Sequence, residues 1–113
     1  MWPLWPVTVD VYHAMAERGI LHSGDPVELL EGVIVQKPVK NPPHSTANEV
    51  ARHTLEGVLP AGWIVRAQNP ITLATSEPEP DLTVIRGSLR RYRTRHPGPR
   101  EVGLVMEISG TSL

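Results

Sequence analysis

Two apolar segments near the C-terminal end decide the fold of this chain: PDLTVIRG, residues 80–87, and EVGLVMEIS, residues 101–109. The first contains LTVI and the second VGLVM, and both are nearly continuous in apolar or β-branched residues. Short apolar runs bounded by Gly, Pro or charged residues are typical of strands that are covered on both faces. We therefore predict buried strands at residues 81–86 and 102–108.

The N-terminal third of the chain predicts a helix followed by a hairpin. Residues 8–18 form the helix, in which Thr8 can cap the first turn and Gly19 can supply the left-handed residue that ends it. In VELLEGVIVQ, residues 27–36, two short strands meet at a Glu-Gly turn, and β-branched residues dominate the second strand.

The middle of the chain predicts one long helix after a loop. KPVKNPPHS, residues 37–45, predicts a loop, because Pro removes a backbone donor and disfavours helix in the residue before it. A T-x-x-E capping box at Thr46 and Glu49 predicts a helix over residues 47–59. Its apolar positions recur at steps of three and four residues: Ala47, Val50, Ala51, Leu55, Val58 and Leu59.

The remaining segments complete a fold of the α/β class. We expect strands at 63–67 and 71–73, and a loop at 87–100 with one short helical turn. The order of helix, hairpin, helix and strands indicates a central mixed sheet within a single domain, residues 1–113. Only one long helix is available to cover two sheet faces. We therefore expect a core that is incomplete at the C-terminus, where further chain or a partner chain would cover it.

The composition excludes several classes of protein. The sequence has no cysteine, so it contains neither a disulfide framework nor a thiolate metal site. It has no run of about 18 apolar residues, and its N-terminus, MWPLWPV, lacks the pattern of a secretory signal. These features favour a cytoplasmic protein that does not enter a membrane. The net charge of −1 argues against a polycation that coats nucleic acid indiscriminately.

Charge is unevenly distributed along the chain. Glu77, Glu79 and Asp81 fall within five residues, and no further acid appears before Glu101. Six of the 11 basic residues lie in this interval: Arg86, Arg90, Arg91, Arg93, Arg95 and Arg100. Such a run is most often a solvated loop, but it would also suit a metal ion held beside a polyanion.

Asp81 and Glu107 are the residues best suited to chemistry, because both lie on the predicted apolar strands. A carboxylate inside such a strand is costly to bury unless it is paired or bound to a metal ion. Asp81 could instead cap the start of its strand, and Glu107 could pair with Arg66 or face water at a sheet edge. Two acids at adjacent strand ends would form an oxygen site for Mg²⁺ or Mn²⁺, which could polarise a phosphodiester and activate water.

Histidines offer a weaker alternative for metal binding. His44 and His53 are nine residues apart, which is not the i,i+4 spacing of helical zinc ligands. We therefore expect no zinc site on this pair. His96 follows the arginines, and we expect it to stabilise a loop.

Six pieces of the sequence resemble the Uma-type restriction endonuclease family, which belongs to the PD-(D/E)xK nuclease superfamily. In order, they are VYHAMAERGIL, VELLEGVIVQKP, NPPHSTANEVARHTL, AQNPITL, SEPEPDLTVIRG and RYRTRHPGPREVGLVMEISGTSL. No single piece is specific, since Pro-Asp is a common dipeptide, but the six in order span nearly the whole chain. The resemblance implies a restriction endonuclease-like fold and metal-dependent hydrolysis of phosphodiester bonds in nucleic acid, with DNA as the first expectation.

The family pattern implies roles for individual residues. Pro80-Asp81 matches the PD motif, which makes Asp81 a catalytic metal ligand, and Glu107 matches the second acid. Glu28 matches an acidic position before the Gly turn and would help to place the metal ion or its water, although an exposed strand residue is an equally good interpretation. The arginines that would contact nucleic acid are Arg86, Arg90, Arg91 and Arg93.

The sequence departs from the family pattern at the catalytic lysine. The superfamily has lysine two positions after the second acid, where this chain has Ser109. In Uma-type relatives the lysine migrates to a following helix, and here no lysine follows Lys40. Loss of a positioned charge stabiliser costs about 10²–10³ in rate. We therefore expect an active site that this chain does not complete.

Three functions remain open at this point. The first is a metal-dependent endonuclease that is complete only with more chain. The second is a catalytically degenerate binding module that pairs through an exposed strand with a partner chain or a second copy. The third is a small α/β domain whose acids are structural. No motif separates DNA from RNA as the substrate of the first.

Overall fold

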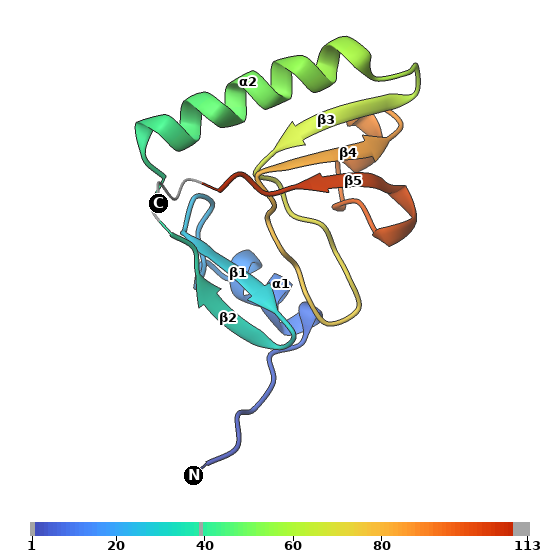
Figure 1. Ribbon diagram of the computed structural model, residues 1–113. Coiled ribbons are helices and arrows are strands. Elements are labelled where there is room, and N and C mark those ends of the chain that lie inside the picture. The colour runs from blue at the N-terminus through green and yellow to red at the C-terminus, as the bar shows by residue number, and fades with distance from the viewer. Residues whose placement is uncertain (1, 39, 110–113) are drawn as a thin grey trace. The chain divides into compact units, whose positions relative to one another are not determined.

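The computed structural model of the protein describes residues 2–38 and 40–109 (Figure 1). The contacts of the chain separate into two compact units. The first comprises Met1–Val39 and Thr72–Pro78, and the second comprises Lys40–Ile71 and Glu79–Leu113. Each unit has a sheet of its own.

Helix α1 (Val9–Glu17) belongs to the first unit and forms where the sequence predicts it. The Thr8 hydroxyl oxygen accepts the N–H of Val11 at 3.1 Å, which satisfies one free donor of the first turn. Gly19 adopts a φ of +75° after the last turn, a conformation that side chains disfavour. Tyr12 supplies the buried face of the helix.

The predicted hairpin is also confirmed in the first unit. Strand β1 (Val27–Leu30) pairs antiparallel with β2 (Val33–Gln36). The two residues between them, Glu31 and Gly32, both have positive φ, 47° and 81°. This is the geometry of a two-residue type I′ turn, whose twist matches that of the flanking strands.

The returning segment Thr72–Pro78 completes the core of this unit. The N–H of Glu77 donates to the carbonyl of Leu29 at 2.7 Å, and both residues are buried. The hydroxyl of Ser76 accepts the N–H of Glu31 at 2.9 Å and donates to Glu31 Oε1 at 3.0 Å. These bonds hold the hairpin turn against the segment.

The second unit is built on three strands: β3 (Trp63–Ala67), β4 (Leu82–Arg86) and β5 (Val102–Met106). They lie in the order β3-β4-β5, and both neighbouring pairs are antiparallel. The predicted sheet was mixed, and this was wrong for the described strands. Parallel neighbours need a long crossover, usually a helix, and neither connection here contains an α-helix. Leu82 and Ile85 of the central strand are fully buried.

Helix α2 (Pro42–Val58) begins within the segment that was predicted to be a loop. The Asn41 side chain accepts the N–H of His44 at 3.0 Å and caps the helix. Two prolines occupy the first helical positions, where a missing N–H costs nothing. The predicted loop over 37–45 therefore ends early, and the predicted capping box at 46–49 lies inside the helix.

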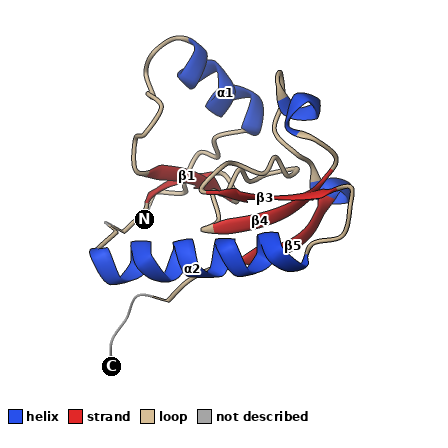
Figure 2. Ribbon diagram, turned by 90° about the horizontal axis from the view of Figure 1, so that it is seen from above, coloured by secondary structure: helices blue, strands red, loops and turns tan. Residues whose placement is uncertain are grey.

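The buried face of α2 also differs from the predicted apolar stripe. The helix lies along one face of the three-stranded sheet, beside β3 (Figure 2). Val50 and Val58, which were expected to be buried, are 62% and 72% exposed, whereas Asn48 is 4% exposed. The inward face therefore includes polar residues, and only part of the predicted stripe is at least half-buried: Ala51, Leu55 and Leu59.

Two further strand predictions need correction. Residues 71–73 form no strand, although Ile71 is buried at 4% exposure. Strand β5 ends at Met106, and its Leu104 and Val105 are 42% and 46% exposed. Among the described residues β5 pairs only with β4, so its apolar side chains lack the cover that the prediction assumed.

Candidate functional site

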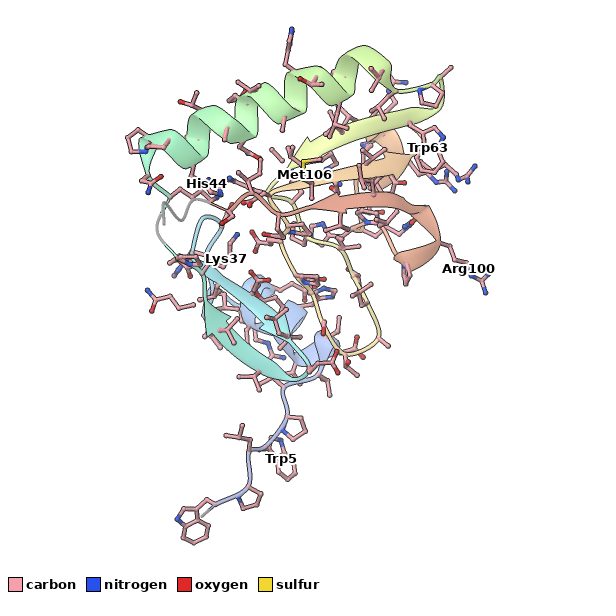
Figure 3. All side chains as sticks on the ribbon, viewed as in Figure 1. Trp5, Lys37, His44, Trp63, Arg100 and Met106 are labelled. Atoms are coloured by element: carbon pink, nitrogen blue, oxygen red, sulfur yellow. The ribbon has the colours of Figure 1, made fainter. Side chains whose placement is uncertain are left out.

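Asp81 lies immediately before β4 and is buried, with 8% of the residue exposed. Its Oδ2 accepts the backbone N–H of Ile108 at 2.7 Å and lies 3.1 Å from Nε2 of His44. Ile108 follows β5, whereas His44 lies near the N-terminal end of α2, on the side that faces the sheet (Figure 3). The carboxylate is thus held by two elements that are distant in sequence.

The acid-bearing ends of β4 and β5 lie side by side. In the register of these strands Leu82 is opposite Met106, and Asp81 and Glu107 are the next residues outward. Both acids lie just outside the paired part of their strands, because the ladder ends at Leu82 and Met106. This relation between two segments 26 residues apart is set by the strand register.

Glu107 is exposed, contrary to the expectation of an acid inside a buried strand. Strand β5 ends one residue earlier, and it is an outer strand of the described sheet. The structure therefore matches the alternative of an acid at a sheet edge that faces water.

Two polar residues of α2, His44 and Asn48, were not predicted as part of this site. They are one helical turn apart and therefore share the face that packs on the sheet. Nδ1 of His44 and Oδ1 of Asn48 are both buried and have no hydrogen-bond partner among the described residues. The sequence signal was a run of polar residues at steps of four: His44, Asn48 and Arg52. It was missed because the helix was expected to begin after His44.

Glu28 lies in the first unit, on β1, opposite Val35 of β2. It is half-buried, so it is not the exposed strand residue of the plainer interpretation. Its suggested help in placing a metal ion stays a prediction.

The four arginines that were expected to contact nucleic acid have different surroundings. The guanidinium of Arg86 lies over the ring of Trp63, 4.7 Å from its centroid. Nε of Arg91 pairs with Glu101 at 3.1 Å. All four are exposed, and two of them form no ion pair within the described residues: Arg90 and Arg93.

Glu101 organises the arginine-rich loop. Arg95 donates to both carboxylate oxygens at 2.7 Å, and the N–H of Gly98 donates to Oε1 at 3.0 Å. These hydrogen bonds, Arg95 first, lower the pKa of Glu101 to about 2. The one acid at the end of the arginine run is therefore engaged in holding the loop.

The donor set at the β4–β5 ends fits one kind of metal ion better than others. The described residues contain no group of three His, Cys, Asp or Glu that could hold a metal ion. A closed zinc site, which needs four protein ligands, has no basis there. Mg²⁺ is commonly bound by one or two carboxylates and completed by water and substrate phosphate. Asp81 and Glu107 would supply that number of carboxylates.

A comparison with protein families matches residues 9–113 to Uma2, described as “Putative restriction endonuclease”. The chain belongs to the Uma2 family. The resemblance drawn from the six sequence pieces is thereby confirmed. A comparison with curated proteins gave no match.

The Uma2 chain is also similar to a solved structure, the crystal structure of “a putative nuclease belonging to DUF820” from Anabaena variabilis. The two are 22% identical with a TM-score of 0.62, and the match covers 81% of this chain and 50% of the other. At this identity the likeness concerns the fold alone, and it supports the predicted α/β class. The chain spans about half the length of that nuclease.

No helix among residues 2–38 and 40–109 is both long and apolar enough to span a bilayer.

Proposed function

We propose that this chain carries the metal-binding part of an endonuclease that hydrolyses phosphodiester bonds of nucleic acid, DNA in the first instance. The observation that carries the proposal is the meeting of the Asp81 and Glu107 strand ends, with the Asp81 carboxylate anchored on the backbone of Ile108. Membership of the Uma2 family supports the same reaction class.

Each residue has a distinct part in the proposal. Asp81, whose Oδ2 is held by Ile108 and His44, offers a carboxylate of fixed position to a cation. Glu107, at the exposed end of β5, offers a second carboxylate that substrate can reach. Bound Mg²⁺ would neutralise phosphate charge and lower the pKa of a water molecule. We propose Arg90 and Arg93 as the first contacts to the phosphate backbone.

The proposed site has no lysine at the sequence position that the superfamily pattern gives it. Ser109 occupies the position two residues after Glu107, and the lysines of the sequence are Lys37 and Lys40. We therefore expect cleavage by this chain to be slower by about 10²–10³ than that of a site with a positioned cation. Metal binding should not share this loss.

The test combines metal affinity with cleavage. Isothermal titration with Mn²⁺ and Mg²⁺ should detect binding by the 113-residue chain, and Asp81→Ala and Glu107→Ala should each weaken it by about tenfold or more. Nicking of supercoiled DNA should require the cation and disappear in both variants. Glu49→Gln, which removes an exposed acid of α2, is the matched control and should change neither readout. Equal binding and cleavage in all four proteins would refute the proposal.

The exposed side chains of β5 favour a second candidate function, a binding module without catalysis. Leu104 and Val105 are nearly half-exposed on a strand whose outer edge has no partner among the described residues. Such an edge recruits another strand, from a partner chain or a second copy. Light scattering should then report a dimer that Val105→Lys dissociates. A monomer without metal affinity would count against both candidates.

A further inference from the structure

A cavity of about 770 Å³ lies between α2, β3 and the 3₁₀ turn Leu89–Tyr92 in the second unit. Its lining combines aromatic, apolar and polar side chains, of which six matter here: Arg52, Leu59, Trp63, Arg66, Asn69 and Tyr92. Trp63 marks the far end of β3 from His44 (Figure 3). The cavity therefore lies in the same unit as Asp81 and Glu107, and neither acid lines it.

Arg66 is the side chain of this cavity that the fold does not satisfy. Its Nη1 is buried and has no hydrogen-bond partner in the part of the chain that the structure describes. Its guanidinium lies 5.9 Å from the centroid of the Tyr92 ring, and burial lowers the pKa of Arg66. Buried guanidinium N–H groups almost always donate a hydrogen bond, and a buried donor without an acceptor costs stability. A ligand acceptor in the cavity would remove that cost.

The charge of the cavity is positive. Nε of Arg52 is paired with Glu56 of the same helix at 3.2 Å, so the charges of these two side chains cancel. Glu101, the acid of the neighbouring loop, is taken up by Arg91 and Arg95. Among the described lining residues Arg66 is the cation without an ion pair, and the Asn69 amide adds a further polar group to the lining. The cavity therefore suits a compact anion with several acceptor oxygens.

The strand register places this cation on the face that carries Asp81. Arg66 is directly opposite Thr83, and Asp81 precedes Thr83 by two residues. Side chains two residues apart on a strand share a face and are about 6–7 Å apart along it. Helix α2 lies over this face, since His44 reaches Asp81 and Arg52 lines the cavity.

We propose that the Arg66 cavity binds a phosphate group of a nucleic-acid strand, next to the phosphate that Asp81 and Glu107 would act on. The nucleic-acid identity of the ligand rests on the proposed function, whereas anion binding by Arg66 does not. The site is distinct from Arg90 and Arg93, because it would hold a phosphate in the cavity between α2, β3 and the Leu89–Tyr92 turn rather than on the surface of the loop.

Nuclear magnetic resonance of the three tryptophan indole N–H groups tests this without any label. Trp63 lines the cavity, and Trp2 and Trp5, each 92% exposed, are internal controls. Inorganic phosphate and an eight-residue oligothymidylate, both without metal ions, should shift the Trp63 signal to saturation and leave the other two in place. The oligonucleotide should bind more tightly, since it carries several phosphates.

Arg66→Met should weaken both probes by about tenfold or more, because it removes charge-assisted hydrogen bonds and keeps the stem volume. Arg100→Met is the matched control, since Arg100 is exposed and points away from the sheet (Figure 3), and it should change the affinity less than about twofold. The melting temperature of Arg66→Met should be unchanged or higher, because a buried unpaired donor is removed.

Three results would overturn the proposal. One is an equal affinity in Arg66→Met and the unsubstituted chain. Another is a fall of many degrees in the melting temperature of Arg66→Met, which would make Arg66 a structural residue. The third is binding of phosphate without binding of the oligonucleotide. Asp81→Ala should keep the Trp63 response, because Asp81 does not line the cavity. Intact anion binding by an unsubstituted chain that cleaves no DNA would count against the nuclease and not against this cavity.

Discussion

Asn48→Leu tests whether the polar face of α2 is retained for function at a cost in stability. Asn48 is 4% exposed, and its Oδ1 has no partner among the described residues. An unsatisfied buried polar atom costs about 1–3 kcal/mol, and leucine has a similar size without that atom. Leucine also favours helix over asparagine by about 0.5 kcal/mol. The variant should therefore be more stable by about 1.5–3.5 kcal/mol.

His53→Leu is the control for this substitution. His53 lies on the exposed side of the same helix, so its replacement reports helix propensity alone. Urea denaturation followed by circular dichroism gives both values, and the difference between the two variants isolates the burial effect at about 1–3 kcal/mol. If Asn48→Leu is no more stabilising than His53→Leu, the amide of Asn48 is satisfied in solution and the reasoning fails.

Two further predictions concern the loop and the sheet core of the second unit. The pKa of Glu101 lies below its unfolded value of 4.5, so the ionised carboxylate stabilises the folded protein above about pH 4.5, and this contribution is lost as the pH falls towards 2. The stability difference between the unsubstituted chain and Glu101→Gln should shrink over that interval in urea titrations, and a difference independent of pH would contradict the assignment. Ile85→Ala should cost about 2–5 kcal/mol, because Ile85 is fully buried. Leu104→Ala, at a 42% exposed position, should cost less than about 1 kcal/mol, and similar losses in both would argue against the described core.

The elements that the sequence predicted correctly are those that neighbouring residues encode. Thr8 caps α1 through a hydroxyl three residues from its donor, and the Glu31-Gly32 pair sets the hairpin turn. Strand β4 follows from the apolar run LTVI, which proved to be buried throughout. In each case the deciding interaction spans a few residues, so the pattern is visible in the sequence.

The errors arose where distant segments decide. The start of α2 was misplaced because prolines were taken as a sign of a loop, although the first helical turn accepts them once Asn41 provides the cap. The predicted apolar stripe of α2 was wrong in part, because the hydrogen bond between His44 and Asp81 turns the side of the helix with His44 and Asn48 towards the sheet. The spacing of apolar residues alone does not show this. Strand β5 was expected to be buried, but Leu104 and Val105 are nearly half-exposed. It is an outer strand among the described residues, and its burial depends on segments that do not adjoin it in the sequence.

By itself the sequence determined the family and the strands β4 and β5 next to Asp81 and Glu107, since a strand and its flanking residues are written in one continuous stretch. Only the tertiary structure decided that Asp81 is held by His44, 37 residues earlier, and by the backbone of Ile108, 27 residues later. It also decided that Nη1 of Arg66 lies buried without a hydrogen-bond partner among the described residues. The physical reason is that hydrogen bonds between distant segments depend on how a helix face and a strand register meet, and no local pattern specifies that meeting.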